Sequence, residues 1–483
     1  MYYIGIDLGT SSAKGILADK SGRILKEANV EYPVFYPYEG WSEQNPCDWL
    51  DAAKEILASL SDGISNEIAG VSFGGQMHGL VMLDENDNVI RPAILWNDGR
   101  SQKQTDYLNN EIGKSKLTRL TANIAFAGFT APKMLWVKEN EPENFRRIAK
   151  IMLPKDYVAY MLTGVFSSDY SDASGMLLLD VENKRWSEEM CRICSVKPEW
   201  LPHLFESYEV TGKLKEEYNL PNAVVTAGAG DNAAAAVGTG TVANGSCNIS
   251  LGTSGTIFIS GDNFVSDPGN ALHSFAHATG KWHLMGCILS AASCNKWWIQ
   301  DILQASDYSA ETQNSEPLLG KNSVFFLPYL MGERSPHNDT NAKGAFIGIS
   351  ANTTREQMSL AVLEGVAFAL RDCVESAMKN GLNITSTNIC GGGARSEIWK
   401  KIIANVLNVT VSSPVTEQGP SYGAAILAMV GSGAYNNVYD AVNNIVKIKS
   451  TVKPDSQTVA LYDKKYEIFK SLYPALKNAF AKM

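Results

Sequence analysis

Two short turns rich in glycine and hydroxyl side chains stand half a chain apart in this sequence. The first runs from Gly9 to Ser12 in IDLGTSS, and the second runs from Gly252 to Ser254 in ISLGTSG. Glycine lets a backbone approach a ligand closely, so such turns can present amides and hydroxyls to phosphate oxygens. A single turn of this kind is more often an ordinary hairpin tip. Two copies favour a site that holds phosphate groups.

A carboxylate directly precedes the first turn. Asp7 ends an apolar strand, between Ile6 and Leu8, where a charged group needs a partner. Mg²⁺ would serve, because it prefers oxygen ligands and needs only one carboxylate when nucleotide phosphates and water complete its shell. The alternative is a solvated turn aspartate. Ser250 or Leu251 takes the corresponding place in the second copy, so only the first half supplies a carboxylate.

A second carboxylate, Asp231, lies in VVTAGAGDNAAAAVGTG, a run of small residues that lets another molecule come near. It can accept the proton of an attacking hydroxyl. Because an unperturbed Asp pKa is about 3.9, that proton must move late, once bond formation to phosphorus has acidified the alcohol. The amide of Asn232 could orient a sugar. The alternative is that Asp231 caps the start of a helix.

A polar turn also follows the strand-like run VSF. There Gly74 and Gly75 precede Gln76, Met77 and His78, and such a turn can line a sugar pocket. A lone histidine is more often structural than a ligand, and spacing alone does not separate the two possibilities.

The elements that would position these groups alternate between strands and helices. Each glycine-hydroxyl turn joins two apolar runs, which predicts a hairpin. Residues 46–60 carry one apolar stripe at helical spacing, and Thr354 with Gln357 forms a capping box before a long helix. The glycines 391–393 stand between a strand and a further helix, a place that suits an anion or a nucleotide. The pattern is typical of an α/β layered fold.

Length and composition restrict the class of protein. The 483 residues exceed the roughly 100 to 200 of one domain, so we expect two lobes with a cleft between them. The related turns place the division between residues 1–244 and 245–483. A net charge of -9 disfavours a nucleic-acid or anionic-membrane partner. The start of the chain resembles no signal peptide and no long apolar run follows, which predicts a cytoplasmic protein with reduced cysteines.

Together these motifs resemble the FGGY carbohydrate kinases, which are actin-like ATPases built from two ribonuclease-H-like lobes. The likeness runs nearly end to end and is strongest to the bacterial xylulokinase branch. It rests on WSEQNP (41–46), GGQMHG (74–79), RPAILWNDGR (91–100), GFTAPKMLWV (128–137), LPKDY (153–157), AGAGDNAA (227–234), SLGTSG (250–255), FLPYLMGERSPHN (326–338) and GGGARS (391–396).

The resemblance implies a role for each candidate residue. Asp231 would be the catalytic base, Asp7 would help to hold magnesium and the phosphates, and Arg119 could be a further sugar contact. The sugar would be bound by Met77, His78, Asp231 and Asn232. The residues that would face ATP are Thr10, Ser11 and Ser12 in the first tip, Gly252, Thr253 and Ser254 in the second, and Gly392, Gly393 and Ala394 near the nucleoside.

The same resemblance implies ATP-dependent phosphorylation of D-xylulose to D-xylulose 5-phosphate by a homodimer. Glycerol kinases carry an Arg-Glu pair where this chain has Met77 and His78, which disfavours glycerol. Substrate assignment within a family of related sugars is an analogy. Two alternatives therefore stay open: a kinase for another ketose or polyol such as D-ribulose, and an actin-like ATPase switch without a sugar substrate.

Overall fold

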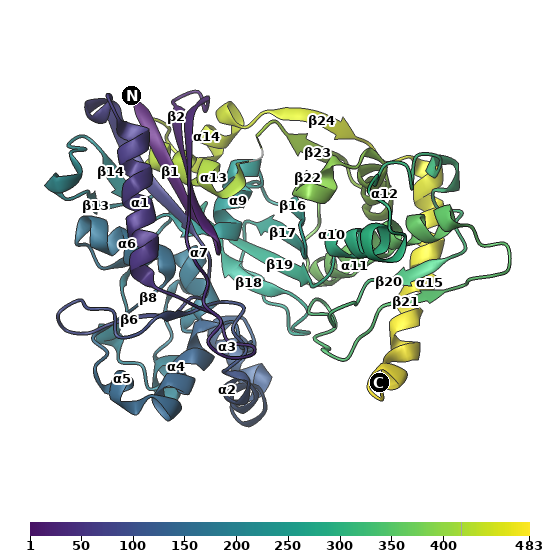
Figure 1. The fold of residues 1–483 in the computed structure, drawn as a ribbon, viewed down its shortest axis with the longest axis horizontal. Coiled ribbons are helices and arrows are strands. Elements are labelled where there is room, and N and C mark those ends of the chain that lie inside the picture. Colours follow the sequence, from purple (N-terminus) through teal and green to yellow (C-terminus); the bar gives the residue numbers. More distant parts are fainter. Residues whose placement is uncertain (417) are drawn as a thin grey trace.

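Two seven-stranded sheets form the centres of two lobes in the computed structural model, which describes residues 1–416 and 418–483 (Figure 1). The first sheet runs β13-β14-β5-β1-β2-β3, with β15 paired to β5. Its strands are β1 (Tyr2–Leu8), β2 (Ser12–Asp19), β3 (Ile24–Glu31), β5 (Ile68–Gly75), β13 (Val210–Lys213), β14 (Val224–Thr226) and β15 (Ala229–Gly230).

The second sheet runs β18-β19-β17-β16-β22-β23-β24. Its strands are β16 (Ser246–Leu251), β17 (Gly255–Gly261), β18 (His273–Ala276), β19 (Trp282–Ile288), β22 (Ser386–Cys390), β23 (Val411–Pro414) and β24 (Ile448–Val452). In both sheets an antiparallel hairpin leads to a strand that joins its first strand in parallel: β1-β2 with β5, and β16-β17 with β22. The predicted α/β fold with two lobes is confirmed, and the two glycine-hydroxyl turns occupy equivalent hairpin tips.

Helices cover these sheets and build much of the rest of both lobes. The principal ones are α1 (Pro46–Ser61), α3 (Lys114–Thr121), α4 (Thr130–Asn140), α6 (Pro154–Thr163), α7 (Tyr170–Ala173), α8 (Glu188–Cys194), α9 (Asp231–Thr239), α10 (Ala292–Lys296), α11 (Arg355–Lys379), α12 (Glu397–Leu407), α13 (Gly419–Gly431), α14 (Val438–Ile445) and α15 (Ser456–Phe480). The helix predicted over residues 46–60 is confirmed and is capped by Asn45, and the predicted capping box of Thr354 and Gln357 opens α11. None of the helices in the described part of the chain is long and apolar enough to cross a bilayer.

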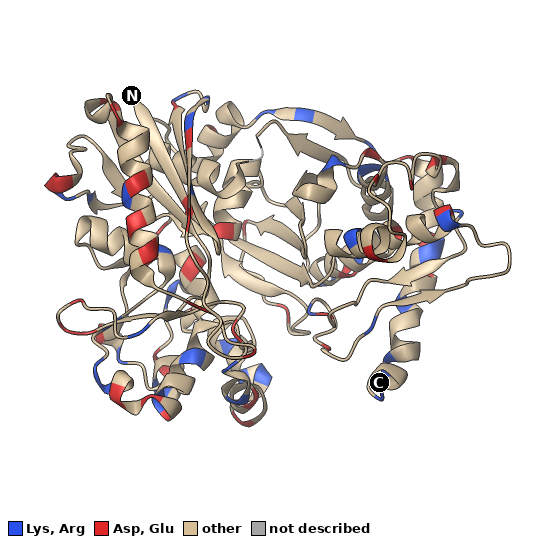
Figure 2. Ribbon diagram, in the orientation of Figure 1, with Lys and Arg blue, Asp and Glu red and all other residues tan. Residues whose placement is uncertain are grey.

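Charged side chains of both signs are interspersed over the helices and loops of both lobes, whereas the central strands are mostly uncharged (Figure 2). The strands are apolar because the sheets are covered: Ile4, Ile6 and Leu8 of β1 and Ile249 of β16 are fully buried. The sheets therefore form the interior on which the hairpin tips are fixed.

A late segment of the chain returns to the first sheet. Helix α13 packs against β1, β5 and α9, and it lies beside β1 and β2 in Figure 1. A Cβ on Gly423 would lie 1.8 Å from the carbonyl oxygen of Ala234 in α9, and one on Gly5 would lie 2.0 Å from that of Ser421. Backbone therefore meets backbone here, and only glycine fits. The division at residues 244 and 245 stays a prediction.

Candidate active site

Asp7 lies at the end of β1, opposite Lys14 of β2 and beside Gly74 of β5. Its Oδ1 is buried and has no hydrogen-bond partner among the described residues. Burial, with the charge of Asp231, raises the pKa of Asp7 to about 7, and Lys14 opposes this shift. A buried carboxylate oxygen without a donor suits a hard cation, which prefers oxygen and would lower that pKa. Asp7 therefore fits the predicted magnesium role.

The rest of a metal shell would come from outside the chain. Among the residues described, no group of three or more His, Cys, Asp or Glu side chains is arranged to hold a metal ion. Mg²⁺ commonly keeps several waters and binds through one or two carboxylates plus substrate phosphates. A site in which Asp7 is the protein ligand is consistent with this coordination preference of Mg²⁺.

The first hairpin tip, residues 9 to 12, is held by side chains from distant segments. Gln44 Nε2 donates to the carbonyl oxygen of Thr10 at 2.7 Å, and Trp96 Nε1 donates to Thr10 Oγ1 at 3.1 Å. Tyr32 donates its hydroxyl to the carbonyl oxygen of Gly9 at 2.6 Å. Ser11 is exposed at the tip and Ser12 is partly buried. These bonds hold the tip from several directions, and the Ser11 side chain is exposed at its end.

Asp231 is the first residue of α9 and follows β15, which pairs with Gly74 and Gly75 at the end of β5. Gly230 rather than Asp231 occupies the cap position, but the Asp231 carboxylate does accept one backbone N–H at the start of α9, so the helix-cap alternative is observed in part. Asp231 Oδ1 accepts hydrogen bonds from Asn232, from the backbone N–H at 2.7 Å and from Nδ2 at 2.9 Å. Burial raises the pKa of Asp231 to about 6, and these two bonds oppose the rise. At pH 7 the group is mainly a carboxylate.

The other two predicted sugar contacts are consecutive residues of the turn after β5, and Met77 contacts the residue that follows Asp231. Met77 is buried, and its Sδ is 3.9 Å from Asn232 Nδ2. His78 adopts a positive φ of 70°, and its ring stacks on Phe129 with centroids 4.6 Å apart. Its Nδ1 lies 2.8 Å from the carbonyl oxygen of Gly175. Burial is the main cause that lowers the pKa of His78 to about 3, so the ring is neutral. Nδ1 then carries the proton and Nε2 is an acceptor.

A buried ionic cluster lies near Asp231, whose charge acts on one of its members, Asp172. The LPKDY motif contains two of its residues, but nothing in the sequence predicted the cluster. Lys155 Nζ contacts Asp156 Oδ1 at 2.6 Å, Asp169 Oδ1 at 2.8 Å and Asp172 Oδ2 at 3.7 Å. These four side chains are at most 2% exposed. Burial raises the pKa of Asp172 well above its usual range, and the charge of Lys155 opposes this rise. Because removing charged groups from water costs free energy, a buried cluster of this kind indicates a structural or functional role.

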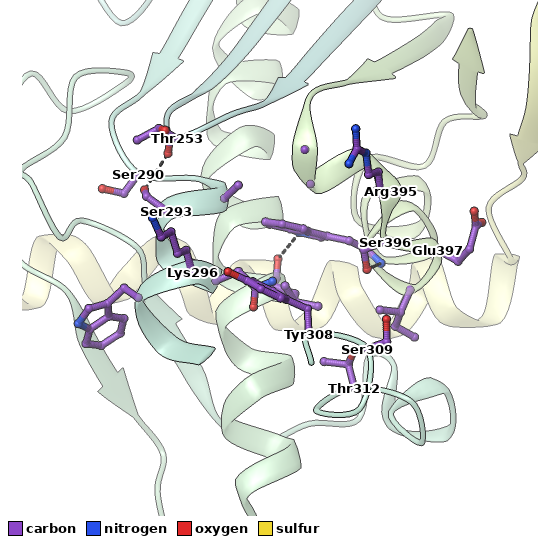
Figure 3. A pocket seen from close by; sticks show the side chains of 18 of the residues that line it. Thr253, Ser290, Ser293, Lys296, Tyr308, Ser309, Thr312, Arg395, Ser396 and Glu397 are labelled. Carbon is purple, nitrogen blue, oxygen red and sulfur yellow. Dashed lines mark hydrogen bonds between the residues drawn. The ribbon is translucent and has the colours of Figure 1, made fainter. Parts of the chain in front are cut away.

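The second hairpin tip borders a large cavity in the second lobe. The cavity has a volume of about 1020 Å³, and Thr253, Gly392 and Gly393 of the predicted residues line it. Figure 3 shows Thr253 near Ser293, which donates its hydroxyl to the Thr253 carbonyl oxygen at 2.7 Å. No sequence motif predicted the other polar lining residues, which include Ser290, Lys296, Tyr308, Ser309, Thr312 and Ser396.

The remaining predicted residues of this lobe flank the cavity. Gly252 accepts from the backbone N–H of Ala292 at 2.8 Å, and Ser254 Oγ donates to the Leu289 carbonyl oxygen at 3.2 Å. Ala394 belongs to the short turn that follows Gly391. In the first lobe, Arg119 is exposed on α3, where its charge acts on Glu189 of α8.

Comparison with known proteins defines the class. Residues 2–238 match the N-terminal domain of the FGGY family of carbohydrate kinases, and residues 247–432 match its C-terminal domain. The chain belongs to this family and is a sugar kinase, a phosphotransferase that uses ATP.

Individual proteins that are similar to this chain have names more specific than that of the family. The chain is 39% identical to the xylulose kinase of Escherichia coli, over 98% of this chain and 99% of that protein. It is 40% identical to the xylulose kinase of Lactococcus lactis, over 98% and 96%. Among solved structures, a xyloylose kinase from Brucella ovis superposes with a TM-score of 0.93 at 39% identity, covering 99% of this chain and all of that one.

Proposed function

We propose that this kinase transfers the γ-phosphoryl group of ATP to the terminal hydroxyl of D-xylulose, giving D-xylulose 5-phosphate and ADP. Support comes from the nearly full-length similarity to proteins named xylulose kinase, at 39% and 40% identity. The contacts among Asp231, Asn232 and Met77 carry the mechanism, because they place a carboxylate beside two further groups that can bind a sugar.

Asp231 acts as the general base in this proposal. The sugar oxygen bonds to the γ-phosphorus, the bond from that phosphorus to the β,γ-bridging oxygen breaks, and ADP leaves. The hydroxyl proton passes to Asp231, whose pKa of about 6 leaves it free to accept at neutral pH. Asn232 fixes Oδ1, so the other carboxylate oxygen is the one available to the hydroxyl. Met77 and His78 hold the sugar chain against this base.

Asp7 holds the magnesium ion that accompanies ATP. The ion, when bound, supplies positive charge to the phosphates. Thr10, Ser11 and Ser12 of the first tip and Gly252, Thr253 and Ser254 of the second approach the phosphates from opposite lobes. The cavity beside Gly392, Gly393 and Ala394 receives the nucleoside. Closure of the lobes would exclude water that could otherwise attack the γ-phosphate. A homodimer and a cytoplasmic location stay predictions.

A coupled ADP-release assay tests the proposal. Purified protein with ATP and Mg²⁺ is offered D-xylulose, D-ribulose, L-ribulose, L-xylulose, glycerol and gluconate. We expect a strong preference for D-xylulose. Preference for another sugar would overturn the substrate and keep the kinase. Equal ADP release with and without sugar would support the ATPase switch instead.

A further inference from the structure

Arg334 belongs to the GERSPHN motif of the second lobe, which none of the roles above uses. Its loop is pinned to the end of β19. The backbone N–H of Ser335 donates to the Cys287 carbonyl oxygen at 3.0 Å, and that of Cys287 donates to Ser335 Oγ at 3.0 Å. Glu333 Oε1 accepts from the backbone N–H groups of Leu289 and Arg334, each at 2.8 Å. The base of the Arg334 side chain is therefore fixed.

The guanidinium of Arg334 lies over an aromatic wall that crosses to the first lobe. Its central carbon is 5.5 Å from the ring centroid of Phe126. Phe126 packs against Phe129 at 5.4 Å, and Phe129 stacks on His78. Phe126 also meets the edge of His273 of β18 at 5.0 Å. Arg334 thus belongs to the second lobe, and the rings of Phe126 and Phe129 lead from its guanidinium to the predicted sugar contact His78.

This guanidinium has no carboxylate at ion-pair distance among the residues that the structure describes, although its charge opposes the rise that burial causes in the pKa of the neighbouring Glu333. Its contact there is the face of Phe126, and no carboxylate forms an ion pair with it. Its charge helps to lower the pKa of His78 and of His273, after the larger effect of burial. A partly buried guanidinium carries five N–H donors and is costly to leave without acceptors. The guanidinium therefore offers donors at this place, and no oxygen of the described residues forms a hydrogen bond with it.

We propose that Arg334 binds the sugar substrate, donating hydrogen bonds to the oxygens at the end of the sugar chain away from the reacting hydroxyl. This rests on the proposed sugar site. Asp231 and Asn232 meet Met77 on one side of that site, and Arg334 reaches the His78 side through Phe126 and Phe129. The reacting hydroxyl lies next to Asp231, so the opposite, carbonyl end of the ketose lies next to Arg334. A second-lobe donor on the sugar would also couple sugar binding to closure of the lobes.

The test compares Arg334→Met with wild type. Methionine keeps much of the apolar stem and removes every donor. We expect the KM for D-xylulose to rise about 10- to 100-fold, because a hydrogen bond to a charged group is lost. The KM for ATP should stay within about twofold. Calorimetric titration with D-xylulose in the absence of ATP should show the same weakening of Kd. Arg185→Met, which removes an exposed arginine of the first lobe, is the matched control and should change neither constant.

The outcomes separate the two proposals. A KM and a Kd for D-xylulose within about twofold of wild type in folded Arg334→Met would overturn the role of Arg334 and leave the kinase assignment intact. Wild-type protein that neither binds nor phosphorylates any sugar of the panel would overturn the proposed function itself. If Arg334→Met does not fold, Arg334→Lys keeps the charge and loses the fork of donors, and an unchanged KM in that variant counts against the proposal equally.

Discussion

The backbone N–H of Gly230 donates a hydrogen bond to Ser171 Oγ at 3.2 Å, which ties the residue before Asp231 to the buried ionic cluster. Ser171 Oγ in turn donates to Asp169 Oδ2 at 2.5 Å, and Asp169 Oδ1 is held by Lys155 Nζ. A serine hydroxyl has one proton and can accept at the same time, so it can serve both partners. This chain of contacts fixes where α9 begins and so where the Asp231 carboxylate lies.

Ser171→Ala should therefore act on catalysis through position. The Gly230 N–H loses its acceptor and the start of α9 is less well fixed, so we expect kcat to fall about 5- to 20-fold while the KM for ATP stays unchanged. Ser207→Ala is the matched control: Ser207 Oγ also donates to Asp169 Oδ2, at 2.8 Å, but makes no bond to Gly230. A kcat loss as large in Ser207→Ala would show that the cluster, rather than the Gly230 contact, is responsible.

The Asp231 carboxylate should control the acid side of the pH profile. With a pKa of about 6, the base is protonated and inactive below that pH, so kcat/KM should rise between about pH 5 and 7 and then level. Asp231→Asn should lose about 10² to 10⁴ in kcat. Asn232→Ala removes a bond that lowers this pKa, so its acid limb should move to higher pH. Near-wild-type turnover by folded Asp231→Asn would exclude the role of base.

The sequence was sufficient for the parts of the site that are local in the chain. Glycine-hydroxyl turns between apolar runs predicted both hairpin tips, and their repeat predicted two lobes. The run of small residues before and after Asp231 fits the close packing of β15 and α9. A Cβ on Gly230, for instance, would lie 3.0 Å from Met77.

What the sequence did not reveal depends on long-range contacts. Lys155 and Asp169 are fully buried, whereas such residues are usually exposed, and no spacing pattern predicts that they pair. Arg334 reaches His78 only through a wall of side chains from two lobes. The return of α13 to the first sheet joins residues that are 400 positions apart, as in the bond from the Tyr422 hydroxyl to the Gly22 carbonyl oxygen. The local pattern of residues does not show which distant segments of the chain will be in contact.

Asp7 should destabilise the apoprotein at neutral and higher pH. Its folded pKa of about 7 lies above the unfolded value, so the folded state binds the extra proton and stability falls as pH rises from about 4 to 7. Asp7→Asn lacks this titration and should be more stable than wild type by about 2 to 4 kcal/mol at pH 8, with little difference at pH 4. Urea unfolding at both pH values, without metal, measures it. A stability difference between Asp7→Asn and wild type that is the same at pH 4 and pH 8 would contradict the burial of the Asp7 carboxylate. In kinase assays we also expect Asp7→Asn to be slower than wild type and to need a higher magnesium concentration.

Removing the lysine of the ionic cluster should be more damaging than removing a surface lysine. Lys155→Met leaves Asp156, Asp169 and Asp172 without a cation, and breaking a buried pair costs about 3 to 5 kcal/mol. Lys103→Met, at an exposed pair with Glu139, should cost less than about 1 kcal/mol. Adding Asp169→Asn to Lys155→Met should restore part of the loss. If the double variant is no more stable than Lys155→Met in urea, the cluster is not held by charge pairing.

Gly392 offers a test of the nucleoside cavity that leaves the fold alone. A Cβ at Gly392 would meet no atom within 4 Å, so Gly392→Ala should keep the unfolding temperature of wild type. Because Gly392 lines the cavity, the added methyl occupies space beside the nucleotide, and we expect the KM for ATP to rise several-fold with the KM for D-xylulose unchanged. At Gly393, by contrast, a Cβ would lie 2.8 Å from Leu251 Cβ and 2.9 Å from the Trp399 ring, so Gly393→Ala should lower the unfolding temperature as well. Thermal unfolding and initial rates at varied ATP distinguish the two variants. An unchanged KM for ATP in Gly392→Ala would mean that the nucleotide does not lie against this turn.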